Sequence, residues 1–499
     1  MTIGAALPVL LLATSLVPAI ATFFIPERSH RLRTALNVIA AVVKVVLVGA
    51  LVAGVLYFGL EFEWRAAFLP GIDLVLRADP IPLLFVFLSA LLWLTTTVYA
   101  VGYLADDGHR SRFFGFFGLC VTATVGVALA GNLVTFLVFY ELLTVTTYPL
   151  VVHDGTAKAR AGGRAYLLYT LTGGALLLLG TVWLHALAGP LEFGQTEVVG
   201  ALAVNHRTTL TIVFVILIVA LGFKAALVPL HGWLPQAMVA PAPVSALLHA
   251  VAVVKAGAYG IVRVVHDLFG LPLAQDLGVL MPLTIVAAIT IVYGSTRALI
   301  QDDLKRRLAY STVSQLSYIV LGISVVSLSS TTGGLVHLVH QGIMKVTLFY
   351  CAGNLGKRGV HRVSEMDGIG RRMPVTMLAF TVAAVGMVGI PPTAGFVTKW
   401  YLGLGAAEAG QPWIIGVLAL SSALNAAYFL PPVARAWLPP DPGERSEPAG
   451  RALAGEPGGW LLLPPVATAV SVLGLGILAG APLSPLTWAA FIAEELMPS

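Results

Sequence analysis

Long apolar segments dominate this sequence and limit the folds that the chain can adopt. A helix needs about 20 apolar residues to cross a hydrocarbon layer of ~30 Å, and fourteen segments of roughly that length follow one another along the chain. The sequence therefore predicts an all-α polytopic membrane protein with about fourteen transmembrane helices. The predicted spans are residues 4–25, 34–57, 80–104, 113–130, 132–152, 165–188, 209–229, 243–266, 279–299, 308–327, 333–355, 373–402, 413–437 and 460–480.

Composition excludes several classes of protein. The chain is 58% hydrophobic and 11% charged, with a mean hydropathy of +0.90, which excludes a soluble globular protein. The first span lacks a basic start and a small-residue cleavage pattern, so we expect a retained helix rather than a signal peptide. Cys120 and Cys351 lie in separate spans without metal-ligand spacing, so we expect no metal and no other cofactor. Any redox reaction should belong to another chain, and we expect an ion-transport subunit rather than an enzyme.

The positive charges are distributed unevenly between the loops. If successive loops alternate sides, one side holds 20 of the 29 lysine and arginine residues. The positive-inside rule makes this side cytoplasmic and places both termini outside a cell (cytoplasmic) membrane. The net charge of +5 then reflects basic loops and requires no nucleic-acid partner.

Ionisable side chains inside the spans are the first candidates for function. Five of the eight lysines fall within spans, whereas Glu141 is the one acidic residue well inside a span. Such residues cost a few kcal/mol to insert and normally face water or protein. Lys44 has no polar neighbour in its helix, so snorkelling or contact with another subunit explains it equally well, and it is not a candidate. Lys224, Lys255 and Lys399 have polar or helix-breaking neighbours and, with Glu141, favour function over a structural ion pair.

Two of these lysines lie beside helix-breaking prolines. Pro229 follows Lys224, and Pro391 and Pro392 precede Lys399. Proline lacks an amide hydrogen and clashes with the preceding turn, so we expect both spans to break there. Proline-kinked packing helices are the alternative. Interrupted spans at corresponding positions in two halves are nevertheless typical of transporters built from inverted repeats, with the translocation site at the breaks.

Further titratable groups lie between the two breaks, on three spans. Histidine takes up and releases protons near neutral pH, so a line of such groups with water between them can pass protons sideways. Helical geometry places His337 and His340 about 60° apart, where both can face one cavity, and Lys345 about 140° from His340, on another face. We therefore predict a proton line with secondary members. The groups are His231, His249, Lys255, His337, His340 and Lys345.

Three long motifs resemble one known family. They are FKAALVPLHGWLPQAMVAPAPVSALLHAVAVVKAGAYGIVRV at 223–264, DDLKRRLAYSTVSQLSYI at 302–319 and HQGIMKVTLFYCAGNL at 340–355. They are similar to the proton-translocating antiporter-like subunits shared by Mrp-type Na+/H+ antiporters, respiratory complex I and membrane-bound hydrogenases. The resemblance covers spans 3 to 13. It implies fourteen helices in which helices 7 and 12 are broken and helices 4–8 and 9–13 form two inverted five-helix repeats. The implied divisions are 1–112 for helices 1–3, 113–268 for repeat 1, 279–437 for repeat 2, 438–459 for a cytoplasmic loop, and 460–499 for helix 14 and the tail.

The resemblance also implies roles for individual residues. Glu141 and Lys224 match the family's glutamate–lysine pair on the fifth and seventh helices. Lys255, with His249 in addition, matches the eighth-helix site, and Lys399 matches the terminal site on the twelfth helix.

The match on the eleventh helix is less regular. The family often has a histidine four residues before the eleventh-helix lysine, Lys345, and this chain has Gln341 there. His340 flanks this position and His337 precedes it, so either histidine can be the central one.

Within the family, the length of the chain and Lys399 resemble the D-type subunit of Mrp antiporters. We therefore expect a proton-translocating subunit of a multisubunit Mrp-type antiporter that exchanges protons for a monovalent cation, Na+. Its partners would be other membrane subunits and the lipid bilayer. The alternative is a proton-pumping subunit of a redox-driven complex, either a complex I-like NADH:quinone oxidoreductase or a membrane-bound hydrogenase. A self-contained metabolite carrier is least favoured, because the sequence offers no arginine well inside a predicted span for an anionic substrate.

Overall fold

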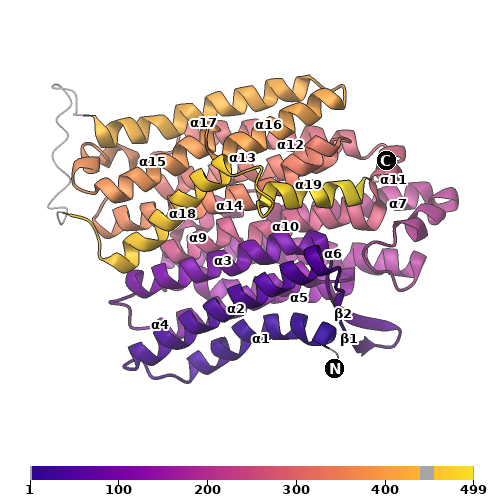
Figure 1. Ribbon diagram of the computed structural model, residues 1–499, viewed down its shortest axis with the longest axis horizontal. Coiled ribbons are helices and arrows are strands. Elements are labelled where there is room, and N and C mark those ends of the chain that lie inside the picture. The colour runs from indigo at the N-terminus through magenta and orange to yellow at the C-terminus, as the bar shows by residue number, and fades with distance from the viewer. Residues whose placement is uncertain (1–2, 439–454, 498–499) are drawn as a thin grey trace.

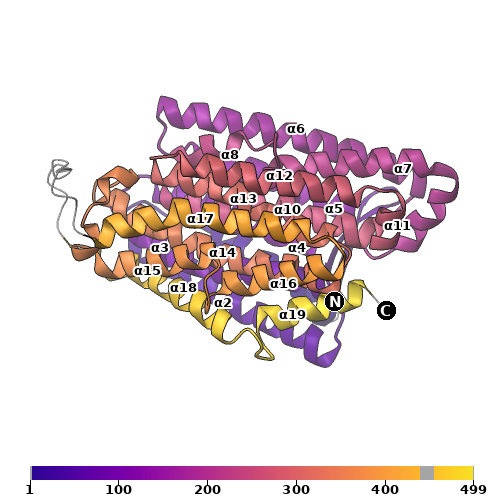
Figure 2. The same ribbon diagram turned by 90° about the horizontal axis from the view of Figure 1, so that it is seen from above.

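The computed structural model describes residues 3–438 and 455–497. Its helices run along one common direction and form an elongated bundle (Figure 1). The two chain ends lie at the same end of the bundle, as an even number of crossings requires (Figure 1). Seen from above, α6 and α7 lie along one edge and α18 and α19 along the opposite edge, with α13 and α14 between them (Figure 2). Most of the predicted cytoplasmic loop, 438–459, lies outside the described residues.

The elements follow one another without a long irregular connection in the described chain. The first half comprises α1 (Ile3–Phe23), α2 (His30–Phe58), β1 (Phe62–Leu69), β2 (Ile72–Ala78), α3 (Pro80–Tyr103), α4 (Arg110–Leu129), α5 (Leu133–Val151), α6 (Ala157–Ala188), α7 (Thr196–Ala225), α8 (Trp233–Gln236), η1 (Ala237–Val239), α9 (Ala242–Ala250), α10 (Val253–Arg263) and the π-helix η2 (Val264–Phe269). The second half comprises α11 (Leu271–Asp276), α12 (Leu280–Leu299), α13 (Leu304–Ser324), α14 (Leu328–Lys357), η3 (Val363–Glu365), η4 (Ile369–Arg371), α15 (Pro374–Val388), α16 (Ala394–Glu408), α17 (Trp413–Trp437), α18 (Gly459–Ile477) and α19 (Pro485–Leu496).

The fourteen predicted spans all coincide with helices, which confirms the predicted fold class. Eleven segments of the described chain are long and apolar enough to cross a membrane. Two further spans, α13 and α14, have the length but carry many polar side chains. The remaining span is divided into α15 and α16. Helices α13 and α14 can carry these polar side chains because both are buried along almost their whole length and need not face lipid.

Both predicted breaks are present. Helix α7 ends at Ala225, and Ala226 has a positive φ of 57°, which turns the chain so that the amide of Leu227 donates to the carbonyl of Gly222 at 3.0 Å. Helix α15 ends at Val388, where Gly389 has a φ of 88°. Each break therefore uses one left-handed residue and leaves the last carbonyls of a helix without helical partners.

The structure adds a third break that the sequence did not predict. Helix α9 ends one residue after His249, and α10 begins two residues before Lys255. The amides of Val251 and Ala252 both donate to the carbonyl of Leu247, at 3.1 and 2.9 Å. No proline marks this site, so the usual sequence signal is missing.

A β-hairpin between α2 and α3 is also new. Strands β1 and β2 pair antiparallel across a turn at Gly71, which has a φ of 77°. Arg65 bonds Glu192 of the α6–α7 connection at 2.7 Å, and Arg77 bonds both Glu63, at 2.7 Å, and Glu192. Burial alone would raise the pKa of Glu192, but hydrogen bonds from the two arginines hold it below its usual value. This network fastens the hairpin to the connection between α6 and α7.

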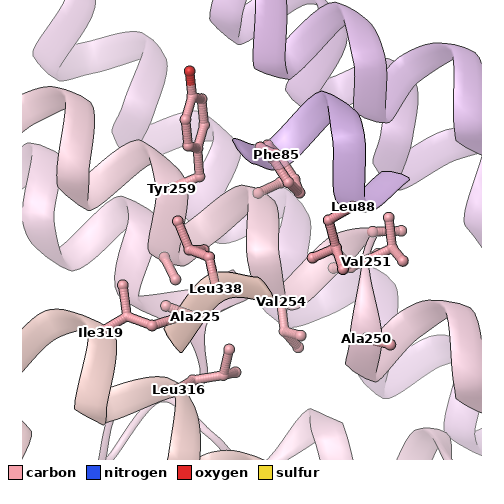
Figure 3. Close-up of a cluster of buried hydrophobic side chains, with 14 of the residues drawn as sticks. Phe85, Leu88, Ala225, Ala250, Val251, Val254, Tyr259, Leu316, Ile319 and Leu338 are labelled. Carbon is pink, nitrogen blue, oxygen red and sulfur yellow. The ribbon is translucent and has the colours of Figure 1, made fainter. Parts of the chain in front are cut away.

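Helix α10 lies at the centre of the bundle and is buried along its whole length. Its Val254 packs near Leu316 and Ile319 of α13 and Leu338 of α14, while Leu88 of α3 lies near the α9–α10 break (Figure 3). The core therefore surrounds α10, which packs against α7 and against α13.

Gly257 allows α10 to approach α7 closely, and a side chain there should disrupt the bundle. A Cβ at this position would meet the backbone of Ala225 and, at 2.8 Å, the carbonyl oxygen of Leu221. Overpacking of this kind costs about 1–3 kcal/mol, so Gly257→Val should lower the melting temperature of the detergent-purified protein.

The matched control is Gly49→Ala, where no atom lies within 4 Å of the added Cβ. Alanine is the better helix former, so this variant should melt at the wild-type temperature or above it. A Gly257→Val protein as stable as the control would contradict the packing described for α10.

Candidate functional site

Glu141 of α5 and Lys224 of α7 approach the same point from two helices, but they do not form an ion pair. Lys224 is fully buried in the last turn of α7. Its Nζ donates to the carbonyl of Tyr140 and lies 3.3 Å from the centroid of the Tyr140 ring. The carboxylate of Glu141 lies against Gly174 of α6, and its buried Oε1 has no hydrogen-bond partner in the described chain. The lysine therefore contacts the residue beside the glutamate rather than the glutamate itself.

Lys255 reaches from α10 to α14. It is fully buried, and its Nζ donates to the carbonyl of Leu338 at 2.6 Å. The neighbouring His337 has two buried ring nitrogens, and Gln341 one turn further has a buried amide, all without a hydrogen-bond partner among residues 3–438 and 455–497. The amide nitrogen of Gln315 on α13 is also buried and has no hydrogen-bond partner in the described chain. Buried polar atoms in this number are normally satisfied by ordered water, so this region is suited to hold a water chain.

The two histidines of α14 have different surroundings. His340 Nδ1 lies 3.0 Å from the hydroxyl of Thr398 on α16, directly before Lys399. The ring of His337 lies 5.3 Å from the ring of Tyr318, and Lys399 Nζ lies 5.8 Å from the same tyrosine ring. The structure therefore brings both histidines between Lys255 and Lys399, each by its own contacts.

Lys399 is held by the broken helix that precedes it. Its Nζ donates to the carbonyls of Val388, at 2.6 Å, and Met387, at 3.3 Å, and to the hydroxyl of Ser422, at 2.8 Å. The two carbonyls belong to the last turn of α15, where the helix dipole favours a positive charge. The break thus provides the ligands for the ammonium group.

Lys345 connects to Lys399 through a hydrogen-bonded chain that the sequence did not reveal. The prediction that Lys345 serves another face of α14 did not foresee this link, because its members are uncharged and lie on three other helices. The three side chains between Lys345 and the carbonyl of Met387 are fully buried, and the hydrogen bonds of ordinary length along the chain measure 2.6 to 3.3 Å. In order, the chain is Lys345, Ser311, Tyr428, Asn425, the carbonyl of Met387 and Lys399.

The two remaining predicted residues, His249 and His231, lie against aromatic rings. His249 is fully buried on α9, and its ring stacks on Phe349 of α14 at 4.6 Å, one turn from Lys345. His231 is half-buried after the α7 break, and its ring lies 4.9 Å from that of Tyr293. Their roles stay predictions.

These contacts define the class of protein. Titratable groups that are buried or partly buried extend from α5 through α7, α10 and α14 to α16. None of the lysines forms an ion pair within 4.0 Å in the described residues. The same residues contain no group of three or more histidine, cysteine or acidic side chains that could hold a metal ion. The chain is a polytopic membrane protein with a buried line of protonatable side chains.

Comparison with known proteins places the chain in a family. Residues 130–425 match the family described as NADH:quinone oxidoreductase/Mrp antiporter, TM. The chain is 37% identical to NADH-quinone oxidoreductase subunit N of Desulforudis audaxviator, over 82% of each chain. It is 29% identical to the D-type subunit of a Na+/H+ antiporter from Bacillus subtilis, over 85% of this chain and 84% of that one. In the solved Mrp complex from Dietzia sp. DQ12-45-1b, a chain superposes with a TM-score of 0.84 at 25% identity, covering 99% of this chain and 98% of that one.

The protein therefore belongs to the family of proton-translocating membrane subunits shared by NADH:quinone oxidoreductases and Mrp antiporters. The predicted resemblance is confirmed. A respiratory sulfane sulfur reductase complex also contains a chain of the same fold, with a TM-score of 0.86 at 22% identity.

The hydrogen-bonded chain between Lys345 and Lys399 can be tested by removing one hydroxyl. Tyr428→Phe keeps the ring but removes the group that joins Ser311 to Asn425. We expect the assembled variant to transport protons several times more slowly than the wild type in reconstituted vesicles.

Tyr401→Phe is the matched control, because the Tyr401 hydroxyl makes no hydrogen bond within the described structure and the residue lies on α16 close to Lys399. Equal rates for the Tyr428 variant, the control and the wild type would show that the chain has no part in transport.

Proposed function

We propose that this protein moves protons across the cytoplasmic membrane along the buried line from Glu141 and Lys224 through Lys255 and the α14 histidines to Lys399. The observation that carries the proposal is the succession of buried lysines held by carbonyls and hydroxyls instead of carboxylates. A fixed carboxylate partner would stabilise each ammonium permanently. Carbonyl and hydroxyl ligands leave the lysine able to take up and release a proton.

The helix breaks give this line its ends. Lys224 lies directly before one break and Lys399 lies after the other. Free carbonyls at a break can bind an ammonium or water in turn. A proton that reaches Lys224 moves next to Lys255 through water, then past His337 and His340 to Lys399, which releases it on the opposite side. Glu141, one residue from the carbonyl that holds Lys224, favours the charged lysine when it is ionised.

The driving force distinguishes two assemblies. The identity of 37% to a quinone oxidoreductase subunit, against 29% to an antiporter subunit over a similar length, favours a redox-driven complex with electron-transfer subunits as partners. The second candidate is an Mrp-type antiporter that exchanges protons for Na+. It is supported by the superposition on a chain of the Mrp complex over 99% of this protein. In either assembly the partners are other membrane subunits and the surrounding lipid.

The first test of the proposal replaces Lys399 with a residue that cannot release its proton. Arginine keeps a positive charge but cannot release its proton in a protein, so Lys399→Arg should stop proton transfer without removing the charge. We expect the rate in vesicles to fall roughly a hundredfold, the low end for loss of a proton-transfer group.

Lys158→Arg serves as the control, since Lys158 is exposed in the first turn of α6. It should transport like the wild type. If an assembled Lys399→Arg complex also kept the wild-type rate, the proposed proton line would be wrong.

The assembly itself can be identified from the purified complex. Co-purification with electron-transfer subunits, and proton transport that requires an electron donor, would establish the redox-driven candidate. Transport that needs no donor and responds to an imposed Na+ gradient would instead establish the antiporter.

A further inference from the structure

Lys44 of α2 is a buried charge outside the line described above. It is completely inaccessible to solvent, so neither snorkelling to the membrane surface nor contact with another subunit, the two explanations that the sequence offered, fits its position. Its Nζ donates to the hydroxyl of Ser15 on α1 at 2.7 Å and lies 5.0 Å from the centroid of the Trp93 ring on α3. The hydroxyl of Thr122 on α4 donates to the same Ser15 at 2.8 Å. Lys44 therefore lies inside a four-helix group.

Within the described residues, no acidic side chain forms an ion pair with the Lys44 ammonium group. Helices α1 and α3 contain no charged residue, and the charges of α4 are Arg110 and Arg112 in its first turn. The other titratable groups of α2 are His30, Arg31 and Arg33, also in the first turn, and Tyr57 near the far end. An ammonium group with one hydroxyl and one ring face is poorly solvated in such a site. It needs either further polar partners or the loss of its proton.

Polar atoms suited to hold water lie on the adjacent face of α3. The Ser89 hydroxyl, the Trp93 ring nitrogen and the Thr97 hydroxyl are buried and have no hydrogen-bond partner in the part of the chain that the structure describes. They are spaced four residues apart, so they follow one face of the helix, and Trp93 places this face against Lys44. Water bonded to these three groups and to the ammonium would satisfy all of them.

A polar track leads from Lys44 to one end of the bundle. Asn37, two turns before Lys44 on the same face of α2, donates to the hydroxyl of Thr22 on α1 at 3.2 Å. One turn further, Arg33 bonds Ser111 of α4 at 2.7 Å and Glu27 at 3.3 Å. Glu27 is partly exposed and belongs to the α1–α2 turn, at the end of the bundle opposite the chain termini (Figure 1), which the charge distribution predicts to be cytoplasmic.

The other side of α3 faces the proton line. Thr96 bonds the hydroxyl of Tyr350 on α14 at 2.7 Å, and Tyr350 follows Lys345 by five residues. Helix α3 packs against α2 and against α14, so it joins the helix of Lys44 to the helix that carries His337, His340 and Lys345.

We propose that Lys44 is an additional proton-carrying site, a hydrated uptake branch that takes protons from the end of the bundle at Glu27 and Arg33 and delivers them across α3 towards α14. The proposal rests on the proposed function, because the branch feeds the same line. A purely structural lysine, which only ties α2 to Ser15, is the alternative.

The test compares two variants of Lys44 in the intact, assembled complex. Lys44→Met has a side chain of similar length without charge or proton, and Lys44→Arg keeps the charge and can reach Ser15 but holds its proton. Proton transport in vesicles is measured over a range of pH. Both variants should slow transport several times and change its pH dependence. The control Val46→Met lies on the exposed face of the same helix and should behave like the wild type.

The outcomes separate this proposal from the function on which it rests. A wild-type rate and pH profile for Lys44→Arg would overturn the uptake branch, and so would a uniform loss at every pH, which indicates a structural role. If Lys44→Met does not assemble, Lys44→Arg decides the question alone. Normal transport by the Lys44 variants while Lys399→Arg is inactive rejects the branch and leaves the proton line in place. If the Lys44 variants and Lys399→Arg all transport protons normally, both the uptake branch and the proton line are wrong.

Discussion

The structure depends on how an apolar bundle solvates ammonium groups without carboxylate partners. Four lysines of the described chain are fully buried, and each donates to backbone carbonyls or to hydroxyl groups. In a low-dielectric interior such ligands are weaker than an ion pair, so a small change of geometry or hydration alters the balance between charged and neutral lysine. A regular helix leaves few carbonyls free for this purpose. At Lys399 the break in the preceding helix supplies the carbonyl ligands, whereas Lys224 and Lys255 take theirs from within α5 and α14.

The three lysines of the proposed proton line differ in their ligands. Lys224 and Lys255 each contact one carbonyl, from α5 and from α14, whereas Lys399 has two carbonyls and a hydroxyl. Lys399 is also joined to Lys345 by a buried chain of hydroxyl and amide groups that needs no water at all. Lys399 therefore has more hydrogen-bond acceptors around its ammonium group than Lys224 or Lys255.

Sequence reasoning recovered the fold because apolar length and proline act locally. Fourteen spans follow from hydrophobicity, and Pro229 and Pro391 marked two breaks. The break between His249 and Lys255 has no proline, so only packing reveals it. Predicted site residues lie on five helices of the bundle, and their part in proton transfer stays a prediction. Glu141 and Lys224 lack the direct pair that the family resemblance implied. The uncharged connectors of Lys345 and the partners of Lys44 were missed for one reason: they come from other helices.

The proposed proton line depends most directly on ordered water between Lys255 and Lys399, and this water can be observed. A cryo-EM map of the assembled complex, at a resolution that shows ordered water, would display the region between Lys255 and Lys399. We expect waters within hydrogen-bonding distance of His337, Gln341 and Gln315, connected to both lysines. A dry region, in which these side chains pair with one another or contact only apolar atoms, would contradict a proton line through the middle of this protein.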